Sequence, residues 1–167
     1  MLFSLIDDLN IFFKGFPHTW CVSGGWAIDL FGGRKTRDRC DLDVSVFNPG
    51  HHDSVEFILG KQWTIEGKEA DGFRRIEDVS DLDEEIRYFW SFPRGAAFIS
   101  EYTDNNGNRR ISYNRQTQES LDYIEVFFDR FEDSEFVYRR NTSIRRSKEK
   151  SVIQKPDYAF LAPELVL

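Results

Sequence analysis

Apolar residues near the start of the chain recur with the period of an α-helix. They stand three and four positions apart between residues 2 and 14, and Gly15 and Pro17 follow. This spacing gathers the apolar side chains on one face, and glycine and proline commonly end helices. The pattern predicts an amphipathic helix over residues 2–14.

Residues 18–61 divide into short apolar runs separated by glycine and proline. The breaks fall at "GG" (24–25), at "GG" (32–33) and at "NPG" (48–50). Run length and alternation separate strands from helices here. The predicted elements are a strand over 18–23, a helix over 26–31, a strand over 41–47 and a helix over 52–61.

The rest of the chain is rich in β-branched and aromatic residues, which favour strands. Strands are predicted over 63–66, 86–92, 96–103, 109–113, 121–128 and 135–140. Pro163 suits the first turn of a helix over 162–167, which the sequence would cut short. We therefore expect one α/β (α+β) domain over residues 1–167, with a mixed sheet and flanking helices.

The composition of the chain limits the kinds of protein it can be. The chain has 167 residues, 40% hydrophobic, which is enough for one packed core. No apolar run is long enough to cross a membrane, and the N-terminal segment carries acids where a signal peptide has basic residues, so a cytoplasmic protein is expected. The net charge of -7 disfavours nucleic acid as a partner.

The segment "DLDVSV" starts with two carboxylates. Side chains alternate along a strand, so Asp41 and Asp43 are expected on the same face. Two adjacent carboxylates repel unless a cation lies between them, and Mg²⁺ prefers such oxygen ligands. A solvated pair of acids is the alternative interpretation.

A glycine turn precedes these carboxylates. In "SGGW", Ser23, Gly24 and Gly25 join a predicted strand to a helix, whose free N–H groups favour phosphate. Arg34, Lys35, Arg37 and Arg39 add mobile positive charge between the turn and the carboxylates. Metal and phosphate together indicate a nucleoside triphosphate, although a plain turn and a hydrated loop would explain the same residues.

The whole segment resembles the nucleotidyltransferase superfamily, which has the DNA polymerase β-like fold. It is most similar to the small aminoglycoside and lincosamide nucleotidyltransferases. Ten positions carry the resemblance: Gly24, Gly25, Trp26, Asp29, Gly33, Arg34, Thr36, Arg37, Asp41 and Asp43. Residues 121–167 resemble later parts of the same group more loosely.

The resemblance implies roles for named residues. Asp41 and Asp43 would hold one or two Mg²⁺ ions, and Ser23, Gly24 and Gly25 would cradle the phosphates of the nucleotide. Glu125 would be the third carboxylate, acting as a metal ligand or as a base toward an acceptor hydroxyl.

Arginines complete the expected nucleotide site. Arg34 or Arg37 would contact phosphate, or pair instead with Asp29. The segment "RRNTSIRR" (139–146) is either an anion-binding patch or a charged strand edge.

Three features depart from the family pattern. Glu125 stands where aspartate is commoner, Arg39 stands where histidine is frequent, and the sequence stops where relatives continue into a helix. Asp122 and Asp129 are expected on the face opposite Glu125.

The predicted function is Mg²⁺-dependent transfer of a nucleoside monophosphate, AMP from ATP, to a hydroxyl of a small molecule such as an aminoglycoside or lincosamide. One alternative is a toxin–antitoxin-type nucleotidyltransferase that modifies protein or RNA. Another is an inactive nucleotide-binding domain of the same fold.

Overall fold

The computed structural model describes residues 3–166 as strands with a few helices. The helices are α1 (Ser4–Phe12), α2 (Gly24–Gly32), α3 (His51–Gly60) and α4 (Lys148–Ser151), with 3₁₀ turns η1 (Val79–Asp81) and η2 (Pro163–Leu165). The strands are β1 (Trp20–Val22), β2 (Asp43–Phe47), β3 (Trp63–Glu69), β4 (Gly72–Ile76), β5 (Tyr88–Pro93), β6 (Ile99–Thr103), β7 (Arg109–Tyr113), β8 (Ile124–Glu132), β9 (Glu135–Val137), β10 (Arg145–Ser147), β11 (Val152–Gln154) and β12 (Ala159–Leu161).

The strands form a mixed sheet in the order β11-β12-β1-β2-β8-β5-β3-β4. β2 is parallel to β8 and β1 is parallel to β12, whereas the other pairs along this path are antiparallel. β9 joins β8 to β10, and β6 pairs with β7 in a separate hairpin. The predicted fold class, helices with a mixed sheet, is confirmed.

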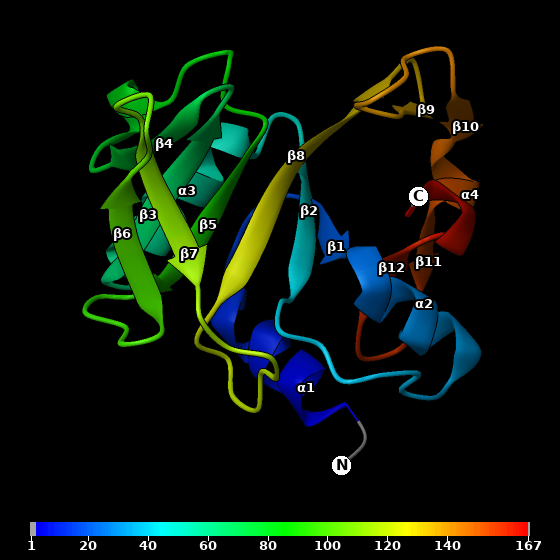
Figure 1. Ribbon diagram of the computed structural model, residues 1–167. Helices are drawn as coiled ribbons and strands as arrows, with labels where there is room; N and C mark the ends of the chain where they lie inside the picture. The colour runs from blue at the N-terminus through cyan, green and yellow to red at the C-terminus, as the bar shows by residue number, and fades with distance from the viewer. Residues whose placement is uncertain (1–2, 167) are drawn as a thin grey trace.

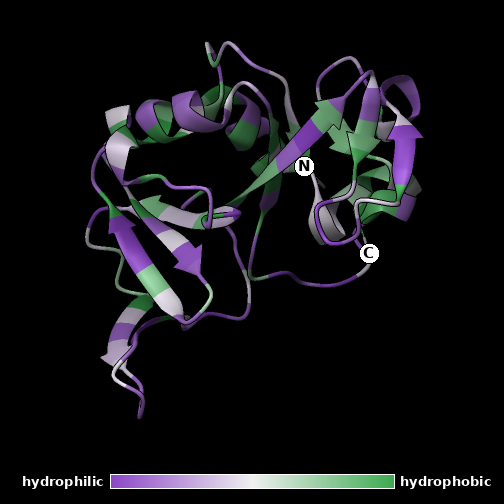
Figure 2. Cartoon of the chain, turned by 90° about the horizontal axis from the view of Figure 1, so that it is seen from above, coloured by the Kyte–Doolittle hydropathy of each residue, from purple (hydrophilic) through white to green (hydrophobic). Residues whose placement is uncertain are grey.

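The main core lies between the central strands and the helices. Val44, Val46 and Val126 are fully buried and belong to one cluster with apolar residues of α1 and α3. In Figure 1, α1 lies behind β8, and α3 lies behind β3 and β5. In Figure 2 hydrophobic residues recur along the strands and on the helices, whereas the loops are mainly hydrophilic. The two helices therefore cover one face of the central sheet.

Several predicted boundaries differ from the observed ones. β2 begins at Asp43 rather than at residue 41, and β8 begins at Ile124 rather than at residue 121. β4, β10, β11 and β12 were not predicted, because strands of three to five residues carry little periodicity of their own. The expected C-terminal helix is only the 3₁₀ turn η2, and the predicted positions 2 and 167 lie outside the described residues.

The loop after α2 is fixed by a buried ion pair. The Asp29 side chain is fully buried, and its carboxylate accepts hydrogen bonds from Arg39 Nε at 2.9 Å and from Thr36 Oγ1 at 2.6 Å. These bonds hold the pKa of Asp29 below its usual value although burial alone would raise it. Arg39 is therefore a fixed structural cation, and the expectation that it is mobile is wrong.

None of the helices within residues 3–166 combines the length and the apolar character needed to cross a bilayer.

Replacing Arg39 with alanine is expected to lower the free energy of unfolding by about 3–5 kcal/mol, because Asp29 would stay buried without its partner. Urea unfolding measures this change. Lys35→Ala is the matched control, since Lys35 pairs with the exposed Asp38 in the same loop and such pairs contribute about 0–1 kcal/mol. Equal losses in the two variants would contradict the assignment.

Candidate active site

The parallel pairing of β2 with β8 brings two carboxylates together. Asp43 is aligned with Glu125, and their side chains lie on the face of the sheet opposite Val44 and Val126. Asp43 is the first residue of β2 and Glu125 the second of β8, so both lie at the starting ends of their strands. The structure thus joins two residues that are far apart in the sequence and were both predicted as site residues.

Burial and neighbouring carboxylates raise the pKa values of both side chains. Burial raises the pKa of Asp43 to about 8, helped by the negative charges of Glu125 and Asp41 and opposed by Arg139 and Arg39. Burial also raises the pKa of Glu125 to about 7 against a hydrogen bond from Tyr123, with Asp41 adding to the rise. Such a coupled pair retains protons near neutral pH when no cation is bound.

Asp41 lies close to this pair but not on the strand. It precedes β2, and its backbone carbonyl accepts a hydrogen bond from Trp26 Nε1 at 2.9 Å. Its charge raises the pKa of both Asp43 and Glu125. Among residues 3–166 no three His, Cys, Asp or Glu side chains form a cluster able to hold a metal ion. Asp43 and Glu125 are therefore a pair with a third carboxylate nearby.

The glycine turn closes directly against Asp43. Gly24 has a φ of 57°, and a Cβ on it would overlap Asp43 Oδ2, so only glycine fits. Ser23 stands at the N-cap position of α2, but its buried hydroxyl makes no capping hydrogen bond and has no partner among the described residues. A free hydroxyl and a helix N-terminus beside a carboxylate are suited to a metal-bound phosphate.

The second glycine of the turn has a different neighbour. A Cβ on Gly25 would overlap Arg39 Nη1, so this glycine makes room for the buried ion pair of Arg39 with Asp29. The expected alternative pairing of Asp29 with Arg34 or Arg37 is wrong. Both of these side chains are exposed and make no ion pair within residues 3–166, which leaves them available to a phosphate.

Aromatic side chains surround Glu125, an arrangement that was not predicted from the sequence. Tyr123 is buried, and its hydroxyl donates a 2.8 Å hydrogen bond to Glu125 Oε1. Trp90 is aligned with Glu125 across β5 and β8 and packs on Tyr123 with ring centroids 5.8 Å apart. Tyr113 of β7 lies on the same tyrosine at 4.2 Å. Tyr123 thus fixes one oxygen of Glu125 and leaves the other available.

Asp129 lies on the face of Glu125, and the expectation that it lies on the opposite face is wrong. Asp129 is four residues after Glu125, and side chains an even number of residues apart on a strand point to the same face. Asp129 Oδ2 accepts a 2.6 Å hydrogen bond from Ser45 Oγ, and Arg139 pairs with the same carboxylate. Asp122 precedes β8 and pairs with Arg115. Neither carboxylate joins the pair of Asp43 and Glu125.

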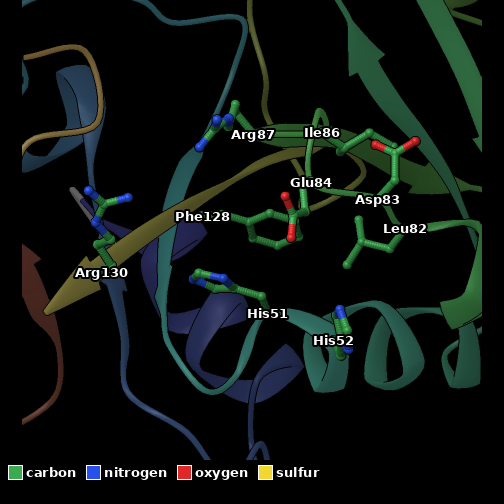
Figure 3. Close-up of a pocket in the computed structure, with 9 residues that line it drawn as sticks. All are labelled: His51, His52, Leu82, Asp83, Glu84, Ile86, Arg87, Phe128 and Arg130. Carbon is green, nitrogen blue, oxygen red and sulfur yellow. The ribbon is translucent and has the colours of Figure 1, made fainter. Parts of the chain in front are cut away.

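A cavity of about 570 Å³ lies away from these residues. It is lined by His51, His52, Leu82, Asp83, Glu84, Ile86, Arg87, Phe128 and Arg130, as Figure 3 shows. Phe128 and Arg130 are three and five residues after Glu125 on β8, and such odd separations place side chains on opposite faces of a strand. The cavity therefore lies on the other face of β8. His51 Nε2 lies 2.7 Å from the carbonyl oxygen of Asp129, and burial lowers the pKa of this histidine. His51 therefore connects α3 to β8.

The mixed sheet, the glycine turn at the start of α2 and the paired carboxylates are together consistent with a nucleotidyltransferase. Residues 6–87 match the family model of aminoglycoside-2''-adenylyltransferase, which supports a nucleotidyltransferase-related family for this chain. The matched range includes the turn, Asp41 and Asp43 and ends before Glu125. No curated protein and no solved structure gave a match.

The coupled carboxylates predict a pH-dependent stability. Both pKa values are raised by folding, so the folded protein binds more protons than the unfolded chain between about pH 4 and pH 8, and stability falls as the pH rises through this range. We expect a loss on the order of 6 kcal/mol from pH 5 to pH 8 in a chelator, since Glu125 titrates over about two pH units and Asp43 over about three, each unit corresponding to about 1.4 kcal/mol. Urea unfolding at the two pH values measures it.

Asp43→Asn should reduce this pH dependence because it removes one member of the pair. Glu56→Gln is the control, since Glu56 is exposed on α3. The same pH dependence in Asp43→Asn and in the unmodified protein would contradict the coupling.

Proposed function

We propose that residues 1–167 form one nucleotidyltransferase domain that transfers AMP from ATP to a hydroxyl of a small molecule, with an aminoglycoside or a lincosamide as the acceptor class. The observation that carries the proposal is the alignment of Asp43 with Glu125 next to the Gly24 turn. The family match over residues 6–87 supports the adenylyl group and an aminoglycoside acceptor.

The residues present fit Mg²⁺ in their chemistry. Asp43 offers the hard oxygen ligands that Mg²⁺ prefers, and a bound cation would lower its raised pKa. Asp41 lies near enough for its negative charge to raise the pKa of Asp43. Asp41 and Asp43 would hold the ion, with Glu125 beside them as the base; a role of Glu125 as third metal ligand is the alternative. Bound Mg²⁺ would neutralise charge on the triphosphate.

The protein groups have separate tasks in this proposal. The turn at Ser23, Gly24 and Gly25 binds phosphate oxygens through the N–H groups of the two glycines and the free hydroxyl of Ser23, since the N–H of Ser23 already donates to the carbonyl oxygen of Asp43. Arg34 and Arg37 add exposed positive charge to the nucleotide site.

Glu125 acts as the base. Tyr123 orients one of its oxygens, and a pKa of about 7 suits proton transfer near neutral pH. The acceptor oxygen bonds to the α-phosphorus, its proton passes to Glu125, and the bond to the bridging oxygen breaks so that pyrophosphate leaves with the electron pair.

Pyrophosphate release in the presence of Mg²⁺, each nucleoside triphosphate and a panel of aminoglycosides and lincosamides tests this function. The double variant Asp41→Ala/Asp43→Ala is expected to abolish release, because it removes the metal ligands. Glu56→Gln is the control. Release that survives the double change would contradict the metal assignment, and release only with added protein or RNA would favour a macromolecular acceptor.

Glu125→Gln separates the two roles of the third carboxylate. If Glu125 is the base, the change is expected to lower kcat by about 100-fold or more with little change in the affinity for ATP. A loss of affinity for ATP with Mg²⁺ in calorimetry, at unchanged kcat, would instead make Glu125 a metal ligand.

A further inference from the structure

Arg139 reaches the face of the paired carboxylates from a distant segment. It lies in the turn that follows β9, and its side chain packs on β8, where the guanidinium carbon lies 4.2 Å from the centroid of the Phe127 ring. Tyr88 stacks on the same ring at 5.1 Å. The cation is therefore placed on an aromatic surface and not in open solvent.

A buried carboxylate holds this arginine in one position. Arg139 Nη1 donates to Asp129 Oδ1 at 2.9 Å and to Oδ2 at 3.1 Å, and Ser45 Oγ donates to Oδ2 at 2.6 Å. The Asp129 side chain is fully buried, and that of Arg139 is 23% exposed. The contacts fix the guanidinium at the point where it still reaches solvent.

Most of the donors of Arg139 stay unused. Both hydrogen bonds to Asp129 come from Nη1, and Nε and Nη2 have no acceptor within residues 3–166. An arginine has five N–H donors, arranged in a fork that suits phosphate oxygens. A fixed guanidinium with free donors is a pre-organised site for an anion.

The location of Arg139 relates it to the proposed reaction. Arg139 lies on Phe127, which is two residues after Glu125 on β8. Phe127 is aligned with Ser45, which is two residues after Asp43 on β2. Two residues span about 7 Å along a strand. The cation is thus one short step from the carboxylate pair and on the same face. Arg39 is less suited to this role, because its side chain is only 5% exposed against 23% for Arg139, and its Nε and Nη2 donate to Asp29 and Thr36.

We propose that Arg139 binds the β- and γ-phosphate groups of the nucleoside triphosphate and the pyrophosphate that leaves. This inference rests on the proposed function. When the bond between the α-phosphorus and the bridging oxygen breaks, the electron pair and the negative charge move to pyrophosphate. The free donors of Arg139 stabilise that charge without having to move first.

Calorimetry of ATP, AMP and pyrophosphate, each with Mg²⁺, tests the inference. Arg139→Ala alone would leave Asp129 buried and charged, so the comparison is between Asp129→Asn and the double variant Asp129→Asn/Arg139→Ala, which differ only in the arginine. The double variant is expected to bind ATP and pyrophosphate about 10- to 100-fold more weakly, the loss of a charge-assisted hydrogen-bond pair. The affinity for AMP should not change.

Arg140→Ala is the matched control, since Arg140 is exposed and adjacent in sequence. Equal affinities for ATP of the single variant and the double variant, or equal losses for ATP and AMP, would overturn the role of Arg139 and leave the proposed function intact. If the unmodified protein binds neither ATP nor pyrophosphate, the proposed function fails and this inference fails with it.

Discussion

The parallel pairing of β2 with β8 is the constraint on which the candidate site depends. Its register is fixed by the apolar side chains that both strands direct toward α1 and α3, among them Val44 and Val126. A shift by one residue in either strand would turn its carboxylate toward the helices and its valine toward solvent. The hydrophobic core on one face therefore determines the chemistry on the other.

Electrostatic compensation separates the structural carboxylates from those of the candidate site. Asp29 and Asp129 are fully buried, and each is paired with an arginine. Asp43 and Glu125 have each other as neighbours, with Asp41 adding further negative charge, and their pKa values rise. Asp29 and Asp129 are thus each paired directly with an arginine, whereas Arg139 and Arg39 only partly offset the negative charge around Asp43.

The sequence predicted the local parts of this arrangement better than the long-range ones. The helix at the start, the glycine turn and most central strands follow from short-range spacing, and the alternation of residues 121–128 placed Glu125 on a strand. The contacts of Asp129 with Ser45 and Arg139 were not predicted, because they join segments whose relative position no local pattern encodes, and the hydrogen bond from Tyr123 to Glu125 was not predicted either. The short strands β10, β11 and β12 were not predicted for a related reason, because their pairing with other strands and not their periodicity defines them.

The close approach of Gly25 to Arg39 links two positions on either side of the loop. The guanidinium occupies the volume that any side chain at position 25 would need, and it remains there because Asp29 is buried beside it. A larger residue at position 25 is compatible with the fold only together with a shorter one at position 39, which in turn would leave Asp29 without its cation. The turn that faces the carboxylates therefore cannot change its composition independently of the interior behind it.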